Sequence, residues 1–236
     1  MIITKKSDID ISNLSDGIVL LIDKDKGKTS FNVVSNIRKI FNIKKVGHAG
    51  TLDPAATGLL IIALGRKTKE IYKYQNMPKT YTGIITLGKK TPSMDSETEP
   101  VEIKSFDHVS ENDIEEVKKT FLGEIQQIPP MYSALKHKGK ALYKYARKGI
   151  DIKREPRTVN IYDFEINKIE LPDITFKIKC SKGTYIRVIA DDFGAKLNCG
   201  GYLKELRRTR IGEYKVEDAL TISELSEKVS LNKTAS

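Results

Sequence analysis

The residues best suited to chemistry lie in one short loop, Gly47-His48-Ala49-Gly50-Thr51-Leu52-Asp53-Pro54-Ala55-Ala56-Thr57-Gly58. One carboxylate, that of Asp53, stands there between a histidine and several small residues. Glycine and alanine leave room for a flat ligand to approach the backbone, and the proline restricts the chain directly after Asp53. Two plainer interpretations stay open. Asp53 can be a turn-former that bonds its own backbone, and His48 can be an ordinary packed histidine.

Buried strands and a helix must position this loop. Residues 18–22 and 59–64 are continuous apolar runs, which are typical of buried strands. Ser30 is predicted to cap a helix that runs to about Phe41, with apolar residues at helical spacing. Further strands are expected at 81–87, 159–169 and 174–180, and further helices at 67–74, 110–121, from Thr184 and from Thr221. Because strands and helices mix without a regular alternation, the fold class is predicted to be α+β.

Basic residues exceed acidic ones and gather in three stretches. The chain of 236 residues has 41 Lys and Arg against 31 Asp and Glu, a formal net charge of +10. Residues 24–45, 136–157 and 204–215 are basic, whereas residues 95–116 hold nine acidic residues and one lysine and should face away from a polyanion. Lysines neutralise phosphates and tyrosines stack on unpaired bases, so nucleic acid is the favoured partner. Each stretch taken alone can also be a solvated surface.

Other classes of protein fit the sequence poorly. The longest apolar run, residues 59–64, has six residues, whereas a membrane helix needs about 20. Residues 1–8 lack the pattern of a signal peptide, so we expect a cytoplasmic protein. Cys180 and Cys199 are too far apart for a CxxC pair, and the three histidines have no ligand spacing. We expect no membrane segment, no metal site and no disulfide.

The loop closely resembles the catalytic motif of the TruB family of tRNA pseudouridine synthases, and other segments resemble further family motifs in the same order. These segments are Leu21-Ile22-Asp23-Lys24 with Gly27, Thr29 and Ser30; Lys79-Thr80-Tyr81; Gln127-Ile128-Pro129-Pro130-Met131-Tyr132-Ser133-Ala134-Leu135-Lys136; Cys180-Ser181-Lys182-Gly183-Thr184-Tyr185-Ile186-Arg187; and Leu206-Arg207-Arg208-Thr209. The resemblance covers roughly residues 17–225, which is far too long for a chance match. It implies a central mixed or antiparallel sheet with flanking helices and an RNA-facing insertion at about 125–157.

The resemblance also implies a reaction. The family breaks the bond between ribose C1′ and uracil N1, turns the base and joins C5 to C1′, which requires no cofactor. Asp53 matches the catalytic aspartate, and an ionised carboxylate suits a nucleophile. The sequence leaves open whether it attacks the sugar or the base, or assists elimination through a glycal. Arg187 matches the arginine that pairs with the aspartate, and Tyr81 matches the tyrosine that stacks on the target uracil near C5.

Other matched positions are expected to bind substrate. Tyr185 and Leu206 match residues that line the uracil pocket, although both can also pack in the core. His48 matches a residue that resembles a wedge in RNA from which a base has been flipped. Lys24 is expected to support the Tyr81 side of the pocket, with a solvated turn lysine as the alternative.

By the same resemblance the substrate is the T-arm stem-loop of tRNA, modified at the uridine at conventional position 55, without a guide RNA. Phosphate contacts are expected from basic residues of the insertion and of the 204–215 stretch: Lys136, Lys138, Lys140, Arg147, Arg207 and Arg208. Nothing in the sequence demands a protein partner or more than a monomer. We expect one catalytic domain over residues 1–236.

Two departures from the family pattern stand out. Asp25 follows Lys24 where the family usually has proline, and we expect only a small local effect. We also expect no C-terminal RNA-binding domain of the PUA type. Two other functions remain as alternatives: a tRNA-binding or chaperone protein without catalysis, and a guide-RNA-dependent pseudouridine synthase.

Overall fold

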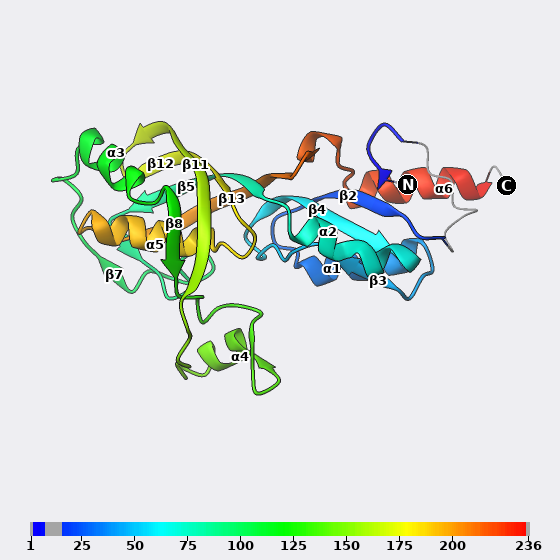
Figure 1. The fold of residues 1–236 in the computed structure, drawn as a ribbon, viewed down its shortest axis with the longest axis horizontal. Helices are drawn as coiled ribbons and strands as arrows, with labels where there is room; N and C mark the ends of the chain where they lie inside the picture. Colours follow the sequence, from blue (N-terminus) through cyan, green and yellow to red (C-terminus); the bar gives the residue numbers. More distant parts are fainter. Residues whose placement is uncertain (1, 8–15, 235–236) are drawn as a thin grey trace. The chain divides into compact units, whose positions relative to one another are not determined.

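The structure, a computed structural model, describes residues 2–7 and 16–234. Residues 1 and 8 of the N-terminal segment used for the localisation prediction lie outside the described residues. The chain divides into two compact units (Figure 1). Unit 1 comprises residues 1–81 and 206–236, and unit 2 comprises residues 82–205. Strands β5 (Lys79–Leu87) and β13 (Gly201–Ile211) each contribute residues to both units.

Unit 1 is built on a mixed sheet in which strand order runs β1-β2-β4-β13-β5, with β3 also on β4 and β14 also on β13. Its remaining strands are β1 (Ile2–Ile3), β2 (Val19–Lys24), β3 (Val46–His48), β4 (Thr57–Leu64) and β14 (Tyr214–Lys215). Its helices are α1 (Ser30–Ile40), η2 (Gly65–Glu70), α2 (Ile71–Gln75), η3 (Val216–Asp218) and α6 (Ile222–Thr234). Strand β2 runs antiparallel to β4, whereas β13 runs parallel to it.

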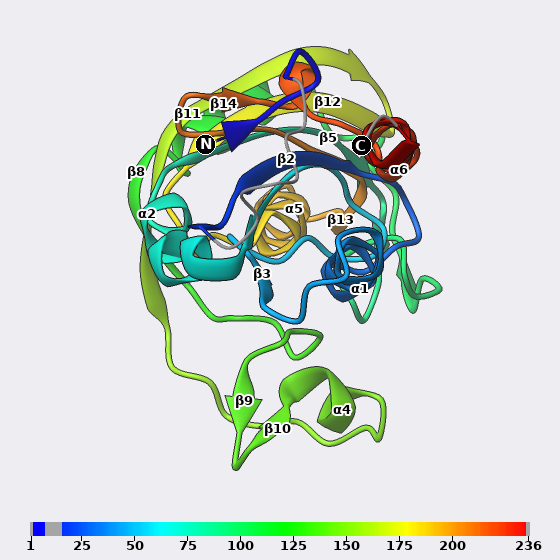
Figure 2. The same ribbon diagram turned by 90° about the vertical axis from the view of Figure 1, so that its right-hand side faces the viewer.

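Both faces of this sheet are covered, which explains why its two central strands read as unbroken apolar runs. Leu20 and Ile22 of β2 pack with α1 and α6, which lie side by side (Figure 2). Val19 and Leu21 point to the opposite face and pack beneath α2 and β14. The predicted strands at 18–22 and 59–64 are therefore confirmed, each with its boundary shifted by one or two residues.

Helix α1 begins one residue from the predicted cap. Thr29, not Ser30, is the N-cap, and its side chain forms a reciprocal capping box with Asn32. Ser30 lies in the first turn and is buried. Its hydroxyl is therefore available for a contact outside the helix.

Unit 2 is built on a second stretch of sheet with strand order β13-β5-β12-β11-β8. The further elements of unit 2 are β6 (Lys89–Lys90), β7 (Glu102–Ile103), α3 (Glu111–Lys119), β8 (Gly123–Gln127), β11 (Arg157–Glu170), β12 (Asp173–Cys180) and α5 (Ile186–Lys196). Four phenylalanine rings join α5 to the sheet and to the end of α3, with Phe193 stacked at 5.9 Å on Phe121 and Phe164 at 5.9 Å from Phe176. This aromatic core fixes the helix that carries Arg187.

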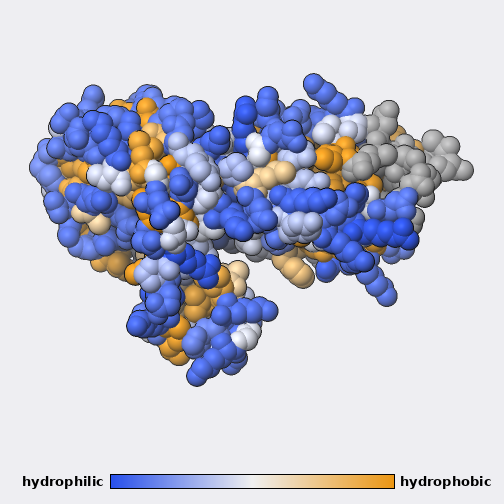
Figure 3. Space-filling model, viewed as in Figure 1, coloured by the Kyte–Doolittle hydropathy of each residue, from blue (hydrophilic) through white to orange (hydrophobic). Residues whose placement is uncertain are grey.

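An insertion between β8 and β11 extends from the rest of unit 2 (Figures 1 and 2). It contains a hairpin of β9 (Lys136–His137) and β10 (Lys140–Ala141), followed by α4 (Leu142–Ala146). On the face shown in Figure 3, hydrophobic residues gather in the middle of the insertion and hydrophilic residues flank them. The predicted α+β class, with a mixed sheet and flanking helices, is confirmed. Within the described residues, no helix is long and apolar enough to cross a membrane.

Candidate active site and its supporting residues

Asp53 lies in the loop that joins β3 to β4 in unit 1, and its side chain is half-buried. The backbone around it is tightly bonded. The Ala56 amide donates to the Asp53 carbonyl at 3.1 Å, and the Gly27 amide donates to the Pro54 carbonyl at 2.8 Å. The loop following β2 is thereby joined to the loop that carries the carboxylate.

The Ser30 hydroxyl forms two hydrogen bonds with the backbone of Leu52, the residue directly before Asp53. The Leu52 amide donates to Ser30 Oγ at 2.9 Å, and Ser30 Oγ donates to the Leu52 carbonyl at 3.2 Å. These bonds join the first turn of α1 to the loop that carries Asp53. The sequence suggested only a capping role for Ser30, because a contact across 22 positions leaves no local pattern.

Lys24 supports the other side of the loop. Its side chain is only 1% exposed, so the alternative of a solvated turn lysine is wrong. Its ammonium donates to the Asp25 carbonyl at 2.9 Å, to the Lys28 carbonyl at 2.6 Å and to the Pro54 carbonyl at 3.5 Å. A buried ammonium needs such partners to offset its desolvation. Lys24 therefore holds the chain immediately after Asp53.

The prediction that Arg208 contacts RNA phosphate is wrong. Its side chain is 1% exposed, and its guanidinium donates to the carbonyls of Gly50, Thr51 and Leu59. A phosphate contact requires an exposed cation, and this one is enclosed by the Asp53 loop and β4.

Arg207, its neighbour on β13, lies partly exposed and forms a bidentate ion pair with Asp23, at 3.1 Å from Nη1 to Oδ1 and 2.6 Å from Nη2 to Oδ2. Arg207 Nη1 also donates to the Thr57 hydroxyl at 3.4 Å. Its charge is therefore already engaged within unit 1, and its predicted RNA contact stays a prediction.

Three more predicted pocket residues belong to unit 1. His48 ends β3 and is partly buried. Its pKa is lowered mainly by burial, and the nearby Arg208 charge lowers it further. A backbone hydrogen bond with Gly50 acts in the opposite direction. Tyr81 lies on β5 and is buried, and Leu206 lies half-buried on β13. The chain before Tyr81 is held by Lys79, whose ammonium donates to the carbonyls of residues at the end of α2.

Tyr185 and Arg187 belong to unit 2, at the start of α5. Arg187 is buried, its guanidinium lies 5.7 Å from the Tyr185 ring centre, and its Nη1 lies 3.9 Å from Oδ2 of Asp95. Gln127 bonds both the amide and the carbonyl of Tyr185, at 3.0 and 3.2 Å. Asp95 is thus buried beside an arginine, unlike the surface acid expected throughout residues 95–116. The pairing of Arg187 with Asp53 stays a prediction.

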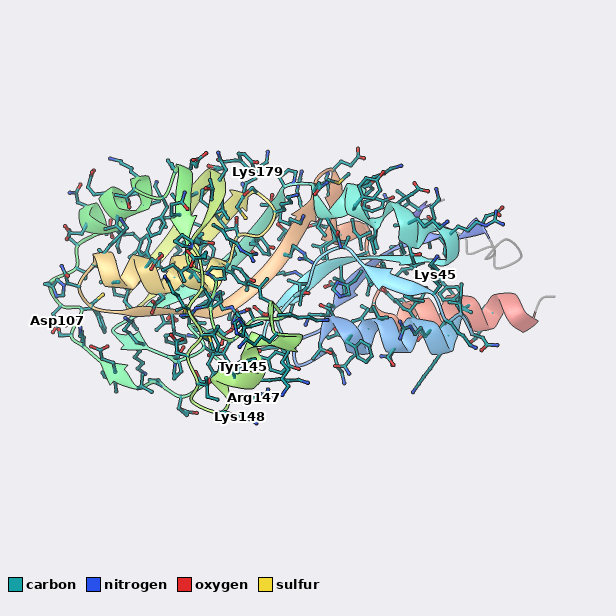
Figure 4. The ribbon with its side chains drawn as sticks, turned by 60° about the horizontal axis from the view of Figure 1, so that its bottom comes forward. Lys45, Asp107, Tyr145, Arg147, Lys148 and Lys179 are labelled. Atoms are coloured by element: carbon teal, nitrogen blue, oxygen red, sulfur yellow. The ribbon has the colours of Figure 1, made fainter. Side chains whose placement is uncertain are left out.

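The basic residues of the insertion that were predicted to contact RNA are exposed, and that contact stays a prediction. Lys136, Lys138 and Lys140 lie exposed on the β9–β10 hairpin. Arg147 lies exposed after α4, with its guanidinium 5.4 Å from the Tyr143 ring centre. In Figure 4, Arg147 lies beside α4, and Asp107 of the acidic stretch lies at the opposite side of unit 2.

Metal ligands are not grouped in the part of the chain that the structure describes: no three His, Cys, Asp or Glu side chains are placed to hold an ion. Cys180 and Cys199 are both buried free thiols. Unit 1 carries the Asp53 carboxylate on a loop held by Lys24 and Ser30, and it also carries His48 and Tyr81, the aromatic residues predicted to contact substrate.

Comparison with known proteins identifies the family of this chain. The N-terminal domain model of TruB family pseudouridylate synthases matches residues 38–186, and the C-terminal domain model of tRNA pseudouridylate synthase B matches residues 187–235. The chain is 51% identical to tRNA pseudouridine synthase B of Chloroherpeton thalassium over 219 residues, covering 91% of each chain. It is 47% identical to that of Flavobacterium johnsoniae over 215 residues, covering 88% of this chain and 94% of the relative.

Solved structures share the fold. A Cbf5-Nop10-Gar1 complex matches with a TM-score of 0.72 and 33% identity over 93% of this chain, which spans 56% of the matched chain. An H/ACA RNP bound to a substrate RNA containing 2′-deoxyuridine matches with a TM-score of 0.70 and 30% identity over 94% of this chain, again 56% of that chain. Fold and family matches together define a pseudouridylate synthase. Within that class, the chain belongs to the TruB family.

Proposed function

We propose that this protein is a tRNA pseudouridine synthase that isomerises the uridine at position 55 of the T-loop. The observation that carries this function is the family match over most of the chain, together with relatives of nearly the same length that are named tRNA pseudouridine synthase B. The resemblance at nearly every position of the Asp53 loop supports the same activity.

The reaction exchanges one bond for another. The C1′–N1 bond breaks, the C5–C1′ bond forms, and the proton that leaves C5 is balanced by one gained at N1. Asp53 is the proposed nucleophile, since a carboxylate that forms a covalent intermediate divides one difficult step into two easier ones. The bonds of Lys24 and Ser30 to the residues flanking Asp53 support this assignment, because a fixed nucleophile loses less entropy on reaching the reactive geometry.

Arg187 and Tyr81 complete the proposed catalytic set. A guanidinium beside the Asp53 carboxylate would keep it ionised in a site from which water is excluded. The ring of Tyr81 would stack on the target uracil, with its phenol near C5. His48, Tyr185 and Leu206 are proposed to contact the flipped nucleotide, and Lys136, Lys138, Lys140 and Arg147 to contact the RNA backbone.

We further propose that residues 1–236 act as one catalytic domain, in the cytoplasm, as a monomer that needs no guide RNA or protein helper. Strands β5 and β13, which contribute to both units, support the single domain. The matched complex that contains Nop10 and Gar1 represents the alternative, a synthase that works in an assembly.

Two assays with the purified protein test these proposals. Mapping of pseudouridine in total tRNA after incubation should show new pseudouridine at position 55 of tRNAs, and modification confined to another position would contradict the assigned target. A bare T-arm hairpin should be modified by the protein alone. Modification of tRNA only in the presence of added protein or guide RNA would favour the assembly-dependent alternative.

A further inference from the structure

We propose that Arg208 and Ser30 are positioning residues for Asp53: they fix the backbone of the catalytic loop from two different elements without contacting substrate. The inference rests on the proposed function of Asp53. It also assigns a role to Arg208 in place of the RNA contact that the structure excludes.

The guanidinium of Arg208 bonds the loop on both sides of Asp53. Its Nη2 donates to the Gly50 carbonyl at 3.1 Å, and its Nη1 donates to the Thr51 carbonyl at 3.4 Å, both before Asp53. Its Nε donates to the Leu59 carbonyl of β4 at 2.7 Å, beyond the end of the loop. One rigid planar group thus sets the distance between the strand that follows the loop and the residues that precede Asp53.

The backbone that carries Arg208 is itself held against the loop. Arg208 pairs in parallel register with Gly58, the second residue of β4. A Cβ atom at Gly58 would lie 2.3 Å from the Arg208 carbonyl oxygen, and Gly58 has a φ of +105°, which disfavours any side chain there. The two strands therefore approach closely at the point where the loop ends. This close approach fixes the backbone of Arg208, from which its guanidinium reaches the loop.

Packing alone does not explain an arginine at this site. Arg208 is among the largest fully buried side chains of the described residues, and burying a charge costs more than burying an apolar side chain of similar volume. Three carbonyl acceptors offset part of that cost. Its charge also acts on the loop, since it contributes to the lowered pKa of His48. A positive field at this place favours an anion such as the Asp53 carboxylate.

Ser30 anchors the loop from helix α1. Its hydroxyl accepts from the Leu52 amide and donates to the Leu52 carbonyl, and no other residue separates Leu52 from Asp53. Gly50, Thr51 and Leu52 are therefore each bonded by a buried side chain from β13 or α1. Loss of either anchor should let the carboxylate shift, and a misplacement of about 1 Å can cost roughly 100-fold in rate.

The test compares Arg208→Met, Arg208→Lys and Ser30→Ala with two controls. Arg66→Met removes an exposed arginine of the same unit, and Ser35→Ala removes a hydroxyl from the next turn of α1. Steady-state kinetics on a T-arm hairpin should show kcat lowered about 10- to 100-fold in Arg208→Met and Ser30→Ala, with KM within a few-fold of wild type. Arg208→Lys should recover only part of kcat, because the three carbonyls are bonded by three separate nitrogens of a planar guanidinium, whereas an ammonium has all its donors on one atom. The controls should match wild type.

Amide hydrogen exchange of residues 49–56 gives a readout that does not depend on activity. Exchange there should rise in Arg208→Met and Ser30→Ala and stay at the wild-type level in the controls. Folded variants with kcat within twofold of wild type, or with unchanged exchange of this segment, would overturn the proposal. If Arg208→Met does not fold, unchanged kcat in both Arg208→Lys and Ser30→Ala overturns it. An inactive wild type whose loop still loosens in the variants would instead refute the proposed function and leave the anchoring in place.

Discussion

His48 illustrates how the loop constrains each of its side chains. Burial and the Arg208 charge both lower its pKa below the ordinary value of 6.5, so at neutral pH the ring is uncharged. A neutral imidazole is suited to stacking where a base has left the RNA helix. The ring is thus prepared for the proposed wedge role without the cost of burying a charge against RNA bases.

The lowered pKa of His48 predicts a pH dependence of stability. Between the folded pKa and 6.5, the unfolded chain binds a proton at this residue and the folded protein does not, so stability falls as pH decreases through that window. Urea unfolding of wild type and His48→Gln at pH 7.5 and 5.5 should show the smaller loss in the variant. Other groups titrate in both proteins and cancel in the difference. Equal losses in the two proteins would contradict the lowered pKa.

The residues that hold the loop were the hardest to predict. The Asp53 loop stood out in the sequence because a histidine, a carboxylate, a proline and small residues stand together in it, but only its resemblance to the family motif singled out Asp53 as the catalytic residue. Arg208 meets Thr51 across 157 positions and Ser30 meets Leu52 across 22. Nothing local distinguishes such residues from an ordinary surface arginine or helix cap, because their partners are backbone carbonyls and amides that only the folded chain brings near.

At the scale of elements, α1 matters because it presents Ser30 to the catalytic loop. The helix starts with a capping box in which the Thr29 side chain accepts from the Asn32 amide at 3.0 Å. Helix α3 starts with an equivalent box of Ser110 and Asp113, far along the chain and in unit 2. The two helices thus start with the same kind of cap, but only the cap of α1 lies next to a residue, Ser30, that bonds the Asp53 loop.

Removing either cap should lower stability, but only one should affect the loop. Thr29→Ala and Ser110→Ala should each reduce the free energy of unfolding by about 1 kcal/mol in denaturant titrations, since each deletes one capping hydroxyl. Thr29→Ala should also raise amide exchange of residues 49–56, because the turn that holds Ser30 loosens, whereas Ser110→Ala should not. Equal exchange of this segment in both variants would show that α1 does not transmit the change.

The elements that sequence predicted are those with strong local patterns. Strands β2 and β4 are unbroken apolar runs, and β11 and β12 flank a turn at Leu171-Pro172. Strand β13 was not predicted. Its 11 residues, GYLKELRRTRI, include five charged side chains, so the segment shows neither the alternation of a half-buried strand nor the apolar run of a buried one. Its position comes from backbone pairing and from the specific partners of Arg207 and Arg208.

At the scale of the molecule, the net charge of +10 understates the local positive charge of the insertion. The acidic stretch lies apart from α4 within unit 2, as Figure 4 shows for Asp107, and three of its nine acidic residues, Glu102, Glu115 and Glu116, pair with lysines of the same unit. Lys136, Lys138 and Lys140 of the hairpin are exposed and form no ion pair within the described residues. The hairpin lysines should therefore contribute more to RNA binding than the lysines that are already paired with glutamates.

This difference can be measured as a salt dependence. Neutralising Lys136, Lys138 and Lys140 to glutamine should weaken tRNA binding and reduce the slope of log Kd against log salt by up to about two to three, since each phosphate contact releases nearly one counterion. Neutralising Lys104, Lys118 and Lys119, which pair with glutamates, changes the net charge equally and should alter the slope little. The same slope change in both triple variants would show that only net charge matters.

Release of tritium from C5 of the target uridine shows whether Asp53 performs the isomerisation, because that proton must leave in the reaction. A T-arm hairpin labelled at the target uridine should release its tritium when mixed with excess wild-type protein. Asp53→Asn should bind the hairpin within a few-fold of wild type and release no tritium above background. Release by Asp53→Asn would contradict the role of this carboxylate. Tight binding without release by the wild-type protein would indicate a tRNA-binding protein without catalysis.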